Sequence, residues 1–123
     1  MTTTTKPHPA IVALPANAVS TEDWQAIGDG RFYRNFDGEN REVAAGTKYG
    51  EDPVVYAHGV QQDDGSIDDG TDEFFSPPGI SISTIDSDGQ QTDTGITLTG
   101  EAARRLADVL VTAADGVDGW SPR

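Results

Sequence analysis

His58 is the residue of this chain best suited to acid-base chemistry, because an imidazole titrates near neutral pH. It lies in the run from Val54 to Gln62, and the only other histidine is His8, near the N-terminus. A general base also needs a partner at a recognisable spacing, and the chain has no Gly-x-Ser-x-Gly nucleophile motif. A structural or surface histidine is therefore the favoured interpretation. A small-ligand-binding protein or a hydrolase that uses His58 is kept as the alternative.

Carboxylates are far more abundant than imidazoles, and a dense group of them follows the run that contains His58. This group, called the acidic loop below, consists of Asp63, Asp64, Asp68, Asp69, Asp72 and Glu73. One hypothesis is that its charges imitate the phosphates of DNA, so that the protein occupies a basic nucleic-acid-binding site on another protein. The alternative is a solvated loop that only maintains solubility, which is what charge runs usually are.

The turn that begins at Asp86 has the oxygen-rich composition of a calcium site, but its spacing does not fit one. An EF-hand register whose acidic triplet ends at Asp88 needs a ligand where Thr84 stands and a bidentate Glu where Gly95 stands. The absence of cysteine excludes disulfides and thiolate metal sites. The sequence therefore predicts no metal, no cofactor and no catalytic residue.

The net charge of −13 limits the partners that this protein can have. It arises from 8 Lys and Arg against 21 Asp and Glu, and the cations form no basic patch. Such a chain repels nucleic acid and anionic membrane surfaces. It also has no apolar run long enough to cross a bilayer, and Met1 to Pro9 does not resemble a secretory signal. We therefore expect a cytoplasmic protein whose partner is another protein with a basic surface.

Aromatic and cationic residues gather in one short stretch of the chain. Trp24, Phe32, Tyr33 and Phe36 stand near two arginines, Arg31 and Arg34. This composition is typical of protein-binding hot spots, although a small core also needs aromatic side chains. We expect two of the aromatics to be buried, and Arg31, Tyr33 and Arg34 to form a candidate contact surface.

Four segments have the alternation of strands, and turn residues separate them. They are 31–36, 54–62, 80–85 and about 94–98, with a weaker candidate at 41–45. Asp86-Ser87-Asp88-Gly89 predicts a hairpin turn between the last two. The composition favours a flexible tail over residues 1–18 and one domain over 19–120.

Two helices are predicted beside these strands. Ser20, Glu22 and Asp23 have helix-start chemistry, which predicts a short helix through about Ile27. The segment 99–115 has the helical period, with Thr99 as its cap and Gly116 as its end. Its apolar stripe consists of Ala103, Leu106, Ala107, Leu110 and Ala114. We expect an α+β fold, in which this helix packs on one face of a three- to four-stranded antiparallel sheet.

The second half of the chain resembles a known family. The residues that carry the resemblance are Gln62-Asp63-Asp64-Gly65, Pro78-Gly79-Ile80, Ile96-Thr97-Leu98-Thr99, and the helix from Glu101 to Asp115 with its Leu-Ala and Ala-Ala-Asp elements. The pattern is similar to a small domain-of-unknown-function family of actinobacteria and their phages. The resemblance implies an accessory protein of such origin, and it supplies no activity.

The function expected from the sequence is that of a non-enzymatic, acidic accessory protein that binds another protein. One form of this hypothesis is an inhibitor of a basic, nucleic-acid-binding host protein. A virion or structural component is a further alternative, and it predicts a defined homo-oligomer.

Overall fold

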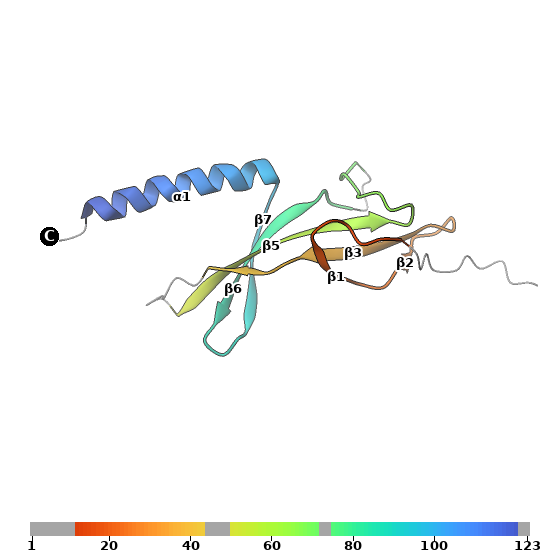
Figure 1. Cartoon of the computed structure of the whole chain (residues 1–123), viewed down its shortest axis with the longest axis horizontal. Helices are drawn as coiled ribbons and strands as arrows, with labels where there is room; N and C mark the ends of the chain where they lie inside the picture. The colour runs from red at the N-terminus through yellow and green to blue at the C-terminus, as the bar shows by residue number, and fades with distance from the viewer. Residues whose placement is uncertain (1–11, 44–49, 72–74, 121–123) are drawn as a thin grey trace, which may run out of the picture.

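The computed structural model describes residues 12–43, 50–71 and 75–120, which form one antiparallel sheet and one helix (Figure 1). The strands are β1 (Ala18–Thr21), β2 (Gln25–Ala26), β3 (Phe32–Gly38), β4 (Arg41–Glu42), β5 (Glu51–Gln62), β6 (Gly79–Asp86) and β7 (Gln91–Leu98), and the helix is α1 (Gly100–Trp120). The α+β class predicted from the sequence is confirmed. The sheet of the described residues has seven strands, more than the three or four expected.

The sheet is built around β5, its longest strand. The order is β1-β3-β5-β6-β7, with β2 also paired to β3 and β4 also paired to β5. β5 pairs with β3 through its second half, where Gln61 faces Arg34 and His58 faces Asp37. The whole of β6 runs beside β5 from Glu51 to His58. Since successive side chains of a strand point to opposite faces, this register places His58 and Gln61 on opposite faces of the sheet.

The four main strands predicted from the alternation of side chains are confirmed as β3, β5, β6 and β7. The predicted hairpin between β6 and β7 is also present. The Asp86 carboxylate accepts hydrogen bonds from the backbone N–H groups of Asp88 and Gln90, each at 2.9 Å. This carboxylate therefore closes the turn, as aspartates at the start of turns commonly do.

The predicted helix over Ser20–Ile27 is wrong, because this segment forms β1 and β2. Thr21 pairs with Phe36, and Gln25 pairs with Tyr33, so both short strands lie along the same edge of β3. The hydroxyl and carboxylate residues at 20–23 favour a helix start only locally. A helix this short is unstable alone, and pairing with β3 satisfies the backbone of the segment instead.

The C-terminal helix is confirmed at its start, where Thr99 Oγ1 accepts a hydrogen bond from the N–H of Ala102 at 3.1 Å. Its predicted end at Gly116 is wrong, since α1 continues to Trp120. One glycine inside a helix costs only about 1 kcal/mol relative to alanine, which does not by itself end the helix.

The predicted packing of this helix on a face of the sheet is also wrong. α1 contacts the sheet only beside β6 and β7, none of its residues is buried, and it runs away from the strands toward its C-terminal end (Figure 1). Thr99 is the only residue between β7 and α1. A single connecting residue does not provide the length that most connections between elements use, so the helix does not turn back over the sheet.

The hydrophobic core of the described residues is small. Its buried hydrophobic side chains are Phe32, Val54 and Val60, and several polar side chains are buried beside them. Within the part of the chain that the structure describes, no helix combines the length and the apolar character needed to cross a membrane.

Candidate functional site

His58 lines a cavity of about 510 Å³ on one face of the sheet. The cavity is lined by residues of β3, β5 and β6 and by the segment 75–77. Tyr33, Tyr56 and Phe75 supply its aromatic walls, and Asp37 lies in the same lining. Gly79 faces His58 across β5 and β6, and a Cβ atom there would come within 3.2 Å of the imidazole Cε1. A glycine at this position therefore leaves room for the ring.

The imidazole of His58 is held by a chain of two hydroxyl groups. Its Nε2 lies 2.7 Å from Ser81 Oγ, which in turn lies 3.0 Å from Thr97 Oγ1. Ser81 is buried, and its hydroxyl group takes part in both of these contacts. A nucleophile-base pair also needs a third group that orients the base, and among the described residues no carboxylate forms a hydrogen bond with the other ring nitrogen of His58. The arrangement thus holds the imidazole in one position within an aromatic cavity.

The acidic loop uses its carboxylates to hold its own turns. Asp64 accepts hydrogen bonds from the hydroxyl and the N–H of Ser66, and these bonds, the hydroxyl one foremost, lower the pKa of the Asp64 carboxyl below its ordinary value. Asp69 has the same relation to Thr71, with the same effect on its pKa. Hydrogen bonds to a carboxylate favour its charged form. Both groups are exposed, and their charges are available to solvent.

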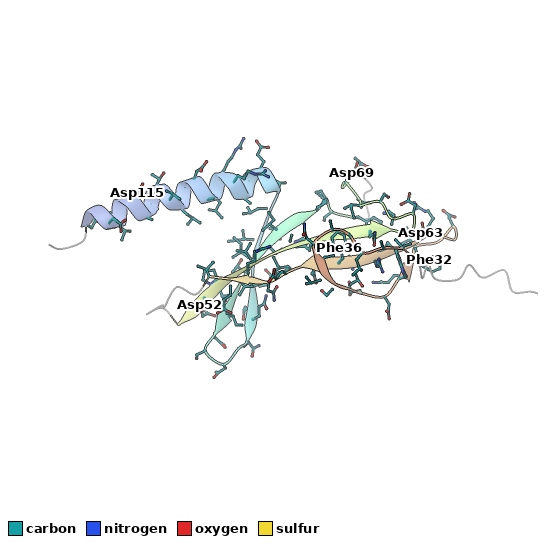
Figure 2. All side chains as sticks on the ribbon, in the orientation of Figure 1. Phe32, Phe36, Asp52, Asp63, Asp69 and Asp115 are labelled. Atoms are coloured by element: carbon teal, nitrogen blue, oxygen red, sulfur yellow. The ribbon has the colours of Figure 1, made fainter. Side chains whose placement is uncertain are left out.

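Two further carboxylates of the acidic loop connect it to the sheet. Asp63 Oδ2 accepts a hydrogen bond from the N–H of Phe32 at 2.9 Å. Asp68 is buried and accepts from the side chain of Gln62 and from the N–H of Gly70. Figure 2 shows Asp63 close to Phe32 at one end of the sheet, and Asp69 farther out. These four carboxylates therefore do not form one continuous charged surface.

The other two members of the acidic loop, Asp72 and Glu73, lie outside the described residues. Among those that are described, no three His, Asp or Glu side chains are grouped so that they could hold a metal ion.

The structure separates the three residues of the candidate contact surface. Arg31 is exposed, whereas Tyr33 is half-buried, donates a hydrogen bond to Gln25 Oε1 and lies 4.8 Å from the Phe75 ring. Arg34 is buried, which corrects the expectation that it lies on a surface. Its guanidinium lies inside the fold, beside the polar side chain of Gln61 and the aromatic ring of Trp24.

The partners of Arg34 come from three parts of the chain. Its Nε donates to Gln61 Oε1 at 2.8 Å, and its Nη2 donates to the carbonyl oxygen of Val12 at 3.1 Å. The guanidinium carbon also lies 4.3 Å from the centroid of the Trp24 ring. Gln61 in turn donates to the carbonyls of Ala13 and Gly65. This buried network ties the N-terminal segment to β3 and β5.

Five of the ten large hydrophobic side chains that are exposed among the described residues lie on α1, where sequence reasoning expected core. The α1 stripe, as defined here, consists of Ala103, Leu106, Leu110, Ala113, Val117 and Trp120. Only Ala103 and Leu106, near the sheet, are half-buried, while Leu110, Val117 and Trp120 are 59%, 54% and 80% exposed. The sequence predicted three members of this stripe, Ala103, Leu106 and Leu110, together with Ala107 and Ala114, which lie beside it. The spacing continues past Gly116, and this signal was available to extend it.

The spacing along the α1 stripe is three, four, three, four and three residues. This is the heptad pattern in which a helix packs against another helix. No charged residue of α1 occupies the positions that flank this seam, where Ala107, Val109, Ala114 and Gly116 stand. A helix with this pattern is suited to burial against a partner helix.

No family model, curated protein or solved structure matches this chain. The resemblance to an actinobacterial and phage family therefore stays a prediction.

Proposed function

We propose that this is a non-enzymatic protein-binding protein whose contact surface is the α1 stripe. The observation that carries the proposal is the exposure of this stripe along a helix that the rest of the described chain does not cover. Large apolar surfaces that are left exposed on a folded protein are characteristic of sites that bind other molecules. An isolated helix gains little stability from propensity alone, so a partner would also stabilise α1.

Two other surfaces are weaker candidates for the contact. The described carboxylates of the acidic loop already accept hydrogen bonds within the loop or from the sheet, which favours a structural role for them. In the cavity beside His58, the imidazole already forms a hydrogen bond with Ser81, and among the described residues no carboxylate orients the ring. The proposal therefore assigns protein binding to α1 and no reaction to His58.

A photo-crosslinking amino acid tests this proposal at two adjacent positions. Leu110 and Val111 are 59% and 61% exposed, but only Leu110 belongs to the α1 stripe. We expect a full-length chain with the crosslinker at 110, produced in the cells that naturally contain the protein, to form a discrete covalent protein adduct. The chain with the crosslinker at 111 serves as the matched control and should form little or none.

The yields of the adducts from the two positions then test the proposed function. A discrete adduct from 110 that exceeds the adduct from 111 by tenfold or more supports it. Equal yields from both positions, or no adduct from either, would show that the α1 stripe is not a specific protein-binding surface.

A further inference from the structure

We propose that the α1 stripe is covered by a second copy of this chain, whose α1 lies antiparallel to the first. This inference rests on the proposed function and names its partner. The two helices would be related by a twofold axis between Leu110 and Ala113, so that each residue of the stripe faces a different residue of the same stripe. A closed twofold pair of this kind is the commonest form of protein oligomer.

The sizes of the side chains fit this antiparallel register. Trp120 would face Ala103 of the other copy, Leu110 would face Ala113, and Leu106 would face Val117. Two of these three contacts combine a large side chain with a small one, which lets facing layers interdigitate without voids. A parallel register would instead stack Trp120 on Trp120 and Ala103 on Ala103. The antiparallel pair is therefore the one with complementary shape.

The charges of α1 favour the same direction. Its cations, Arg104 and Arg105, lie in its first turns, while Asp115 and Asp118 lie in its last turns without any basic residue there. Acidic groups near the C-terminal end of a helix are unfavourable to its dipole. Antiparallel pairing brings Arg104 of one copy to the level of Asp118 of the other, on the same side of the seam. These two residues lie outside the positions that flank the seam, so the pairing places a cation near the acidic end of each partner and reduces the repulsion there.

The rest of the molecule permits this pairing in spite of its charge. α1 carries four acidic and two basic residues, so most of the net charge of −13 lies elsewhere. A helix of 21 residues is about 30 Å long at 1.5 Å per residue. Because α1 contacts β6 and β7, and Ala103 and Leu106 in its first turns are half-buried, the antiparallel pair places the two points of contact with the sheets at opposite ends of the helices. That separation exceeds the Debye length of about 8 Å at physiological salt.

The mass of the purified full-length chain in solution tests the pairing. The mass of one chain is 13.0 kDa, and sedimentation equilibrium at micromolar concentrations should give twice that mass. Leu110→Asn should raise the dissociation constant at least tenfold, whereas Val111→Asn, which changes an equally exposed residue off the stripe, should change it less than threefold. A chain that stays monomeric at several hundred micromolar would overturn the inference.

Charge reversal and crosslinking then test the direction of the helices. Arg104→Asp alone and Asp118→Arg alone should each weaken the dimer, and the chain with both changes should regain most of the affinity. Because the chain has no cysteine, Leu106→Cys chains mixed with Val117→Cys chains should form a disulfide-linked dimer, and neither variant alone should do so. Disulfides within each variant alone would indicate a parallel pair and overturn the antiparallel arrangement.

The two proposals fail in different ways. A monomeric chain that still gives a position-specific adduct from 110 to another protein would refute the second copy and leave the protein-binding function standing. The absence of any adduct, together with a monomeric mass, would refute both.

Discussion

Arg34 shows how a single residue can change its role with its surroundings. In the sequence it stands between aromatic residues, as arginines of binding surfaces do. In the fold it is buried, and its donors reach Gln61 and two backbone carbonyls of the N-terminal segment. A buried guanidinium requires such partners, because burying a charge without hydrogen bonds is very costly. Its role is therefore structural.

Replacing Arg34 by alanine should destabilise the fold. The change removes hydrogen bonds to a charged group and leaves Gln61 Oε1 without its donor, so we expect a loss of about 2 to 3 kcal/mol in the free energy of unfolding. Arg34→Lys should recover little, because an ammonium cannot donate in the fork geometry of a guanidinium. Urea unfolding followed by circular dichroism measures both.

The matched control for this prediction is Arg31→Ala, since Arg31 is exposed three residues earlier in the same chain. Surface substitutions of this kind usually change the stability by less than about 0.5 kcal/mol. Equal losses for Arg31→Ala and Arg34→Ala would contradict the structural role assigned to the buried network.

At the scale of elements, the sequence predicted the strands well and their neighbours poorly. β5 and β6 follow from local alternation of β-branched, aromatic and small polar side chains, which is a property of each segment by itself. The segment at β1 and β2 was misassigned, because its pairing partner, β3, lies outside the segment, with Thr21 paired to Phe36 and Gln25 paired to Tyr33. The burial of Arg34 and the exposure of α1 likewise depend on segments that are distant in the sequence. Local patterns do not contain that information.

Gly70 tests how the acidic loop is held against the segment beside the cavity. Its φ is +85°, and a Cβ atom there would lie 2.6 Å from Pro77 Cδ and 2.8 Å from Pro77 N. Gly70→Ala should therefore cost the strain of a left-handed alanine and also a displacement of Pro77. Gly28 has a similar φ of +89° and open space around it, so Gly28→Ala measures the backbone strain alone.

The difference between these two variants isolates the contact with Pro77. Overpacking of a close contact typically costs 1 to 3 kcal/mol, so we expect Gly70→Ala to be less stable than Gly28→Ala by about 2 kcal/mol. Thermal or urea unfolding of both variants provides the comparison. Equal stabilities would mean that the loop moves away from Pro77 without cost.

At the scale of the whole molecule, the net charge and the α1 stripe make opposite demands. The stripe gains stability when it is covered, because burying apolar surface is favourable by roughly 25 cal/mol per Å². The charge of −13 keeps copies of the chain apart. The position of α1 reconciles them, since most of the acidic residues lie outside the helix, in the strands and in the segments that connect them. Figure 2 shows Asp63 and Asp69 at the end of the molecule away from Asp115, whereas Asp52 lies on the same side as the helix.

The direction of the salt dependence of binding distinguishes a second copy from a basic partner. At about 10 mM salt the Debye length is near 30 Å, which is comparable with the separation of the two sheets, whereas at 150 mM it is near 8 Å. Two chains of −13 therefore repel each other at low salt, and we expect the dimer dissociation constant to fall roughly threefold or more between these concentrations.

A complex with a basic protein would instead weaken as salt rises, because salt screens its attraction. Exposed charges outside α1 provide the control: Glu42→Gln with Asp88→Asn should reduce the salt dependence of the dimer without changing its affinity at 150 mM. A dimer that weakens steadily as salt rises would mean that the Arg104 and Asp118 contacts outweigh the net repulsion, and would contradict this account of the charge.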